Sequence, residues 1–142
     1  QNLFVAQFVG SPVMNVASAT VSKENGKAAV TVEGAPRGFE FPPELLSRLN
    51  GSAGRKLSLG VRPEGVVVSH EAADGFLPAE AHIIEPLGSY DIVDLKFGTQ
   101  MLRARTRSGL VARVGDRVFA RIDPAQAHFF DSESGQSLGV RL

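Results

Sequence analysis

Residues 92–107, IVDLKFGTQMLRARTR, decide the fold class of this chain. Apolar and polar side chains alternate along both halves of the stretch, which is typical of strands that bury one face. The first half places Val93, Leu95 and Phe97 on its apolar face. Between the halves, Phe97-Gly98-Thr99-Gln100 has the composition of a tight turn. The stretch therefore predicts a β-hairpin.

The same alternation recurs along the chain, whereas helical periodicity is scarce. Further strands are predicted over 27–33, 56–62 and 117–123, and over the more weakly patterned segments 15–22, 65–70, 78–85 and 137–142. Helix is predicted only over 3–9 and over 43–49, where Pro43 suits the first turn and Asn50-Gly51 suits the end. Short, regularly spaced strands with frequent Gly indicate a mainly β fold, a small β-barrel or a sandwich.

Composition excludes several classes of protein. The 142 residues suit one domain, or two small lobes that share a core. The absence of Cys excludes a disulfide scaffold, a thiolate metal site and a Cys nucleophile. A formal net charge of zero argues against a dedicated nucleic-acid binder, whose affinity comes mainly from excess positive charge.

No catalytic constellation is present in the sequence. The Gly-Lys pair at Gly26-Lys27 is followed by Ala28, so it does not form a phosphate-binding P-loop. Glu80 and Glu85 are five residues apart, which on a regular strand places them on opposite faces and makes them a poor acid/base pair. The histidines lack metal-ligand spacing and are predicted to be surface or packing residues: His70, His82 and His128. We therefore predict no enzyme activity and no cofactor or metal in this chain.

Charge is distributed unevenly along the chain. Between Arg62 and Lys96 there are seven acidic residues and no Lys or Arg, whereas from Lys96 to Arg121 six Arg and one Lys face Asp116 alone. An acidic strand paired with a basic one is one explanation, with each cross-strand pair worth about 0.2–1 kcal/mol. The alternative is two patches of opposite charge that meet a partner, including a second copy of the chain.

Three segments, taken in order, carry a family resemblance. The first two are FVAQFVGSPVMN at 4–15 and AGRKLSLGVRPEGV at 53–66. The third is dispersed and comprises Glu85-Pro86-Leu87-Gly88, Gly115-Asp116, Asp123-Pro124 and His128-Phe129-Phe130-Asp131. Together they resemble the C-terminal regulatory domain of ATP-binding subunits of ABC importers for sugars and sn-glycerol 3-phosphate. The second segment is more similar to the glycerol-3-phosphate importers.

The resemblance implies an OB-like small β-barrel with a TOBE portion and one or two short helices. Residues 1–12 would be a remnant helix and linker from an upstream ATPase domain, and residues 13–142 the OB/TOBE-like regulatory domain. The family's P-loop, Walker B acid and LSGGQ signature are not found in the sequence, so ATP and Mg would belong to the ATPase domain of the parent protein.

The implied function is non-catalytic regulation and dimerisation of a transporter's ATP-binding subunit. Its partners would be a second copy, the upstream ATPase domain and, through it, the membrane subunits, with a cytoplasmic regulatory protein as a further partner and no nucleic acid. The implied location is cytoplasmic, peripheral to the cytoplasmic membrane. The candidate dimer or regulatory contacts are Ser11, Arg62, Glu64, Glu85, Gly88 and Phe130.

Each candidate contact also has a structural explanation. Ser11, within Gly10-Ser11-Pro12, either ends a helix or forms a hinge. Arg62 and Glu64 share a face if the chain is extended there, as an ion pair or as a dimer contact. Glu85 to Gly88 is predicted to form a strand end and turn, with Gly88 supplying unusual backbone angles, and Phe130 is predicted to close the barrel by aromatic burial.

A small-ligand or oxyanion-binding TOBE-like module is the alternative function. Such sites resemble a Ser-Ala/Ser-Arg-Asn sequence near the start of a strand. The nearest segment here is Ala17-Ser18-Ala19-Thr20, which lacks the Arg-Asn. The alternative stays open on the sequence alone.

Overall fold

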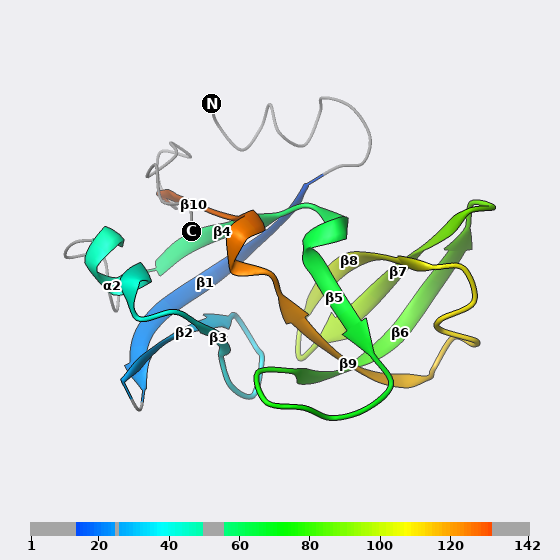
Figure 1. The fold of residues 1–142 in the computed structure, drawn as a ribbon, viewed down its shortest axis with the longest axis horizontal. Coiled ribbons are helices and arrows are strands. Elements are labelled where there is room, and N and C mark those ends of the chain that lie inside the picture. The colour runs from blue at the N-terminus through cyan, green and yellow to red at the C-terminus, as the bar shows by residue number, and fades with distance from the viewer. Residues whose placement is uncertain (1–13, 25, 50–55, 132–142) are drawn as a thin grey trace.

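The computed structural model describes residues 14–24, 26–49 and 56–131 (Figure 1). Strands dominate the described chain, as predicted, with one α-helix and two short 3-10 turns. In chain order the elements are β1 (Asn15–Glu24), β2 (Lys27–Val32), β3 (Phe39–Phe41), α2 (Glu44–Leu49), β4 (Lys56–Val61), η1 (Pro63–Gly65), β5 (Val66–Ser69), β6 (Leu77–Pro86), β7 (Tyr90–Phe97), β8 (Gln100–Arg107), β9 (Arg117–Ile122), η2 (Pro124–Gln126) and β10 (Ala127–Asp131).

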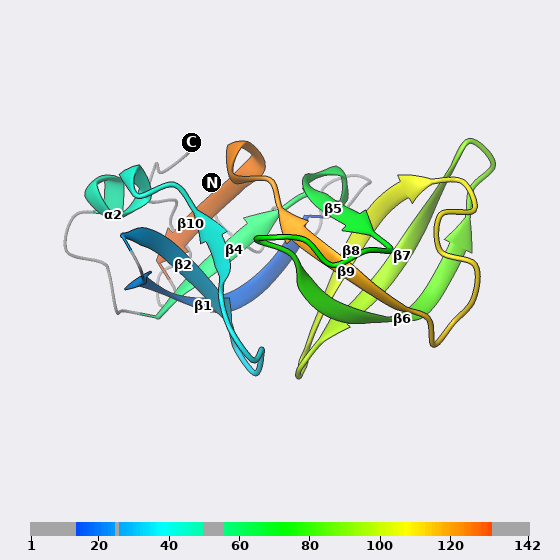
Figure 2. The ribbon, with the colours of Figure 1, turned by 60° about the horizontal axis from the view of Figure 1, so that its bottom comes forward.

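The strands form two five-stranded antiparallel sheets. The strand order is β10-β4-β1-β2-β3 in the first sheet and β5-β9-β6-β7-β8 in the second. Figure 2 shows the two curved sheets at opposite ends of an elongated molecule, with α2 beside the first sheet. The architecture confirms the mainly β, barrel-like prediction.

Most predicted elements are present in the structure. The predicted strands at 27–33, 56–62, 92–97, 101–107 and 117–123 correspond to β2, β4, β7, β8 and β9, and the weaker ones at 15–22, 65–70 and 78–85 to β1, β5 and β6. The helix predicted at 43–49 is α2. The alternation did not predict β3 or β10, which are only three and five residues long. The helix predicted at 3–9 and the strand at 137–142 lie outside the described residues.

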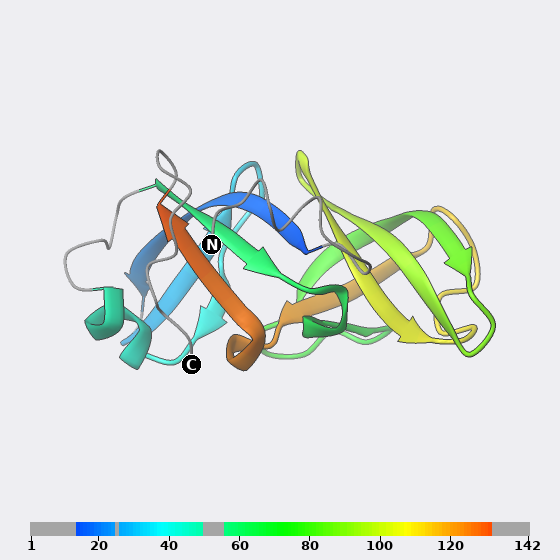
Figure 3. The same cartoon turned by 90° about the horizontal axis from the view of Figure 1, so that it is seen from above.

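The chain crosses between the sheets twice, and the two crossings lie side by side (Figure 3). The first runs from β4 through η1 to β5, and the second from β9 through η2 to β10. The backbone N–H of Asp123 donates to the carbonyl of Gly65 at 2.8 Å and so joins the two crossings. The Asp123 carboxylate also accepts from the N–H of Ala125 at 3.1 Å, which caps η2.

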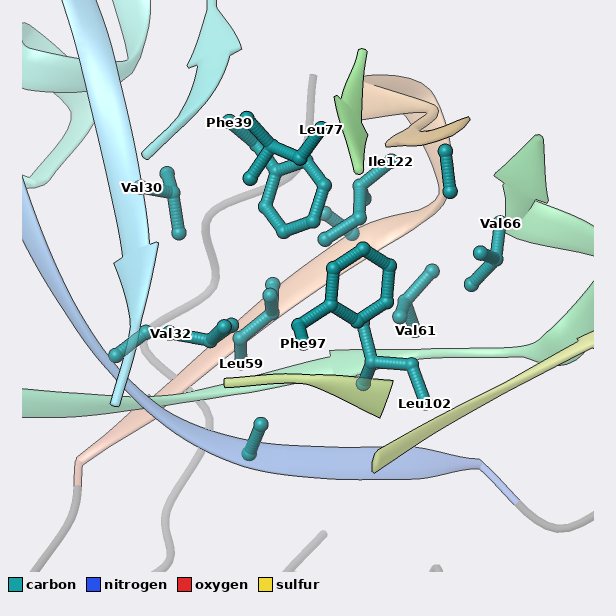
Figure 4. Close-up of a cluster of buried hydrophobic side chains, with 14 of the residues drawn as sticks. Val30, Val32, Phe39, Leu59, Val61, Val66, Leu77, Phe97, Leu102 and Ile122 are labelled. Carbon is teal, nitrogen blue, oxygen red and sulfur yellow. The ribbon is translucent and has the colours of Figure 1, made fainter. Parts of the chain in front are cut away.

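Both sheets contribute to a single hydrophobic core. Figure 4 shows Leu59 of the first sheet close to Phe97 of the second. The rings of Phe39 and Phe97 pack edge to face across the junction, with centroids 5.5 Å apart. Such a pair contributes about 0.5–1.5 kcal/mol beyond the area it buries. The structure thus corresponds to two lobes that share a core.

Two glycine turns bring the sheets into direct backbone contact. Gly34 follows β2 with φ +85°, and Gly98 joins β7 to β8 with φ +57°. A Cβ on Gly98 would lie 1.8 Å from the carbonyl oxygen of Gly34. The hydroxyl of Thr99 donates to the carbonyl of Glu33 at 3.3 Å beside this contact. Only glycines allow the two turns to approach this closely.

Candidate functional site

The predicted contact residues lie on different elements of the fold. Arg62 and Glu64 belong to the first crossing, Glu85 and Gly88 to the end of the β6–β7 hairpin, and Phe130 to β10 in the first sheet. Ser11 lies outside the described residues. The structure therefore does not bring these residues into one cluster, and their roles as dimer or regulatory contacts stay predictions.

The expectation of an extended chain between Arg62 and Glu64 is wrong. Residues Pro63–Gly65 form the 3-10 turn η1, and only Arg62 itself is extended, with φ −73° and ψ 157°. Proline at the first position favours this turn because its φ is preset. Both charged side chains are exposed, while Pro63 and Gly65 are buried. The spacing argument that put the two charges on one face does not apply to a 3-10 turn.

The structure bears out the predicted backbone angle of Gly88 and the predicted burial of Phe130, although Phe130 is not part of the core cluster. Gly88 has φ +97°, in a turn that the N–H of Leu87 closes by donating to the carbonyl of Tyr90 at 2.9 Å. Phe130 is 3% exposed. Its ring packs against Gly60, where an added Cβ would lie 2.8 Å from a ring carbon.

A β-bulge in β6 changes which residues share a face. The register of β6 against β7 shifts between Ala81 and Ile83, so that one extra residue is accommodated. As a result Glu80 lies opposite Lys96 and Glu85 lies opposite Ile92. Lys96 and Ile92 are four apart on a regular strand and share a face, so both glutamates do as well. The prediction of opposite faces for Glu80 and Glu85 is wrong for this reason.

The bulge creates a three-strand surface that we call the β6–β8 face. Three rows of opposed residues run across it from β6 through β7 to β8, because residues opposite each other in a sheet share a face. The rows are Glu85–Ile92–Arg105, Ile83–Asp94–Arg103 and Glu80–Lys96–Met101, with Tyr90 opposite Arg107 at the end. Acidic side chains thus lie on β6 and basic ones on β8.

Two contacts order the basic side of the β6–β8 face. The Arg103 Nε donates to Asp94 Oδ1 at 3.1 Å, and the Asp94 side chain is 17% exposed. The Arg105 guanidinium lies over the Tyr90 ring, 4.0 Å from its centroid, in a cation–π contact. Among the described residues, no carboxylate lies within ion-pair distance of Arg105 or Arg107. The pairing of acidic and basic strands is therefore realised at Asp94–Arg103, whereas the charges of Arg105 and Arg107 are available to a partner.

Asn15 holds the edge of this face against the first sheet. Its Nδ2 donates to the Arg103 carbonyl at 2.8 Å, and its Oδ1 accepts from the Arg103 N–H at 2.7 Å. The carboxamide thus makes the two hydrogen bonds that a neighbouring strand would make with β8, which is an edge strand of the second sheet. β1 and β8 are thereby fixed relative to each other.

Asp91 is a buried charged residue that the sequence reasoning missed. It is 4% exposed, and its Oδ2 accepts from the N–H of Gly109 at 2.9 Å. Its Oδ1 has no hydrogen-bond partner in the described part of the chain. The alternation of the sequence indicates this burial, because residue 91 is two positions before Val93 and four before Leu95 and therefore faces the same buried side of the strand. Asp91 therefore positions the loop that follows β8.

Three residues of the Ala17-Ser18-Ala19-Thr20 segment, Ser18, Ala19 and Thr20, line a cavity of about 320 Å³ on the first sheet. The hydroxyl residues Ser18, Thr20 and Thr31 line it together with Lys56. Lys56 Nζ lies 3.9 Å from the Glu33 carboxylate, which also borders the cavity and offsets its charge. Over residues 14–24, 26–49 and 56–131, no three His, Cys, Asp or Glu side chains gather as a metal ion requires. None of the helices in that part has the length and apolar character of a membrane span.

Two protein-family models together match nearly the whole chain. The family model of the MalK OB fold domain matches residues 10–66, and that of the TOBE domain matches residues 59–130. The two matches overlap at residues 59–66, from the second half of β4 through η1, where the chain passes from the first sheet to the second.

Similar proteins include three bacterial proteins described as sn-glycerol-3-phosphate import ATP-binding protein UgpC. The one from Salmonella typhi is 32% identical over 133 residues, 94% of this chain and 35% of that protein. Those from Shigella boydii serotype 4 and Yersinia enterocolitica are each 34% identical, over 95% and 94% of this chain and 36% of each relative. The chain thus spans about a third of the length of these relatives.

A solved structure supports the fold assignment. The cytoplasmic molybdate-binding protein ModG, with molybdate bound, superposes with a TM-score of 0.62 over 86% of this chain and 97% of that one. The sequence identity is 16%, so the likeness concerns the fold.

Proposed function

This chain belongs to the TOBE-domain family, and we propose that it is the non-catalytic regulatory and dimerisation domain of an ABC importer's ATP-binding subunit. The observation that carries the proposal is the match to import ATP-binding proteins over 94% of the chain. The imported substrate would be a carbohydrate or sn-glycerol 3-phosphate, and the names of these relatives support the second. ATP and Mg would bind to an ATPase domain of the parent protein.

The fold supports a mechanical role in such a subunit. One continuous core, two adjacent crossings and the Asn15–Arg103 hydrogen bonds join the two sheets into a single body. In the proposal, residues 13–142 form this body, and residues 1–12 link it to the ATPase domain. Two such bodies in contact would keep two ATPase domains together while these open and close at the cytoplasmic side of the membrane subunits. A cytoplasmic regulatory protein would act by binding this body.

Sedimentation equilibrium and calorimetry test this proposal. We expect a concentration-dependent dimer of the chain and no heat of binding when Mg-ATP is added. A chain that stays monomeric at every accessible concentration would contradict the dimerisation role. Binding of Mg-ATP by the chain would contradict the non-catalytic assignment.

An oxyanion-binding module is the second candidate, and it rests on the cavity lined by Ser18, Thr20 and Thr31. Hydroxyl groups and an ammonium are groups that hold an oxyanion. The nearby Glu33 weighs against this function because its carboxylate would repel an anion. Calorimetry with molybdate, sulfate and sn-glycerol 3-phosphate distinguishes the two candidates, since a saturable heat with any of them would favour the module.

A further inference from the structure

We infer that the second copy of this chain docks on the β6–β8 face, with β6 of each copy lying over β8 of the other. The inference rests on the proposed dimerisation and names the surface that carries it. Its basis is the charge separation across the face, with Glu80 and Glu85 on β6 and arginines on β8.

The charge pattern selects one of two symmetric ways to stack this face on itself. A two-fold axis parallel to β7 places each row of one copy over the same row of the other copy, with the two ends of the row exchanged. Glu85 of one copy then lies over Arg105 of the other. An axis across the strands would instead place β6 over β6 and β8 over β8, acid on acid and base on base. The parallel axis brings like charges together only on β7, where Lys96 and Asp94 each lie over their own copies and Asp94 is already paired with Arg103. Because like charges in contact disfavour a complex, the parallel axis is the more favourable of the two arrangements.

The composition of the face suits an interface. Ile83 and Met101 are 56% and 43% exposed, although both are large apolar residues. Ile83 lies on β6 between Glu80 and Glu85, and Met101 lies on β8 beside Arg103, in a neighbouring row of the face. Met, Arg and aromatic residues are enriched in interface centres. Arg105 is already held over Tyr90, so less side-chain freedom would be lost when it meets a carboxylate.

The size of the face predicts a weak, salt-sensitive dimer. Three strands of about eight residues span about 27 Å by about 14 Å, or about 400 Å² of flat area. A standard stable interface buries about 800 Å² on each partner. The isolated chain should therefore associate in the micromolar range, with affinity that falls at high ionic strength because the paired charges lie near solvent.

Charge reversal tests the inference by sedimentation velocity over a concentration series. The acidic-side variant is Glu80→Lys/Glu85→Lys, and the basic-side variant is Arg105→Glu/Arg107→Glu. Each alone should weaken dimerisation at least tenfold, because positions 85 and 105, which lie opposite each other, then carry like charges. Mixed in equal amounts, the two variants should form a heterodimer with an affinity within threefold of the wild type.

Matched controls carry the same charge changes outside the β6–β8 face. Glu71→Lys/Asp74→Lys alters exposed acids of the β5–β6 loop, and Lys23→Glu/Arg113→Glu alters exposed bases of β1 and the β8–β9 loop. Both should dimerise like the wild type. Unchanged thermal melting of every variant, followed by circular dichroism, excludes unfolding as the cause of a weaker dimer.

The possible results separate this inference from the proposed function. A wild-type dimer that both reversals leave intact, or that the controls weaken equally, would overturn the docking face while dimerisation stands. Failure of the mixed variants to form a heterodimer would also overturn it, and would favour a different protein as the occupant of the face. A wild-type chain that is monomeric at all concentrations would overturn both.

Discussion

Replacing Gly98 by Ala should destabilise the chain far more than the same replacement at Gly26. Both glycines have positive φ, +57° and +78°, so each Ala incurs a similar left-handed strain of about 1–2 kcal/mol. Around Gly26 no atom lies within 4 Å of an added Cβ, whereas at Gly98 the carbonyl oxygen of Gly34 lies at 1.8 Å. Gly26→Ala is thus a control that carries the backbone strain without the collision.

The collision sets the size of the difference. Real Cβ atoms essentially never approach another heavy atom within 3.0 Å, so the two turns must separate by at least 1.2 Å, the difference between 3.0 and 1.8 Å. Gly98 directly follows Phe97, so this separation disturbs the Phe39–Phe97 pair. Loss of that pair and the resulting packing defect should cost a further 2–3 kcal/mol, roughly.

Thermal and urea denaturation at pH 7, followed by circular dichroism, measure this difference. For a chain of this size, 2–3 kcal/mol corresponds to a melting temperature about 6–12 °C lower for Gly98→Ala than for Gly26→Ala. The reasoning is refuted if the two variants differ by less than about 0.5 kcal/mol, the usual range for surface substitutions. That result would mean that the sheets separate at these turns without loss of core packing.

Two further predictions concern polar side chains that hold backbone groups. Asn15→Leu removes both hydrogen bonds to the Arg103 backbone and should lower the free energy of unfolding in urea by about 1–3 kcal/mol. Asn15→Asp keeps only the acceptor, so its stability should fall between those of Asn15→Leu and the wild type. Equal stability of all three proteins would refute the role of Asn15 in holding β8. Asp91→Ala should speed hydrogen exchange of the Gly109 amide at least tenfold, while Asp91→Asn, whose side-chain oxygen still accepts this N–H, should change it little. Equal protection in both Asp91 variants would show that the loop is held by other contacts.

The sequence indicated much of the fold because its signals are local. Alternation over 92–107 predicted β7 and β8 since a strand with one buried face repeats its pattern every two residues. Gly88 was expected at an unusual backbone angle for an equally local reason, and its φ of +97° agrees. β3 and β10 escaped prediction because three and five residues are too few to show a period.

The candidate surface was predictable only in part. The sequence shows that an acidic segment precedes a basic one, and its motifs indicate Glu85 as a candidate contact. The bulge between Ala81 and Ile83 was not visible in the sequence, because it is a property of pairing between β6 and β7. That single inserted residue brings Glu80 and Glu85 onto one face and creates the surface on which the docking inference rests.

By itself the sequence determined that the chain is mainly β, where most strands lie, and which family it resembles, since each depends on residue types and their spacing along the chain. Only the tertiary structure decided that β10 joins the first sheet, that Gly34 and Gly98 touch, and that Asn15 completes the edge of β8. These features join residues far apart in the sequence. The free energy that stabilises these features comes from packing and hydrogen bonds across the junction of the sheets. A local sequence pattern does not predict such contacts.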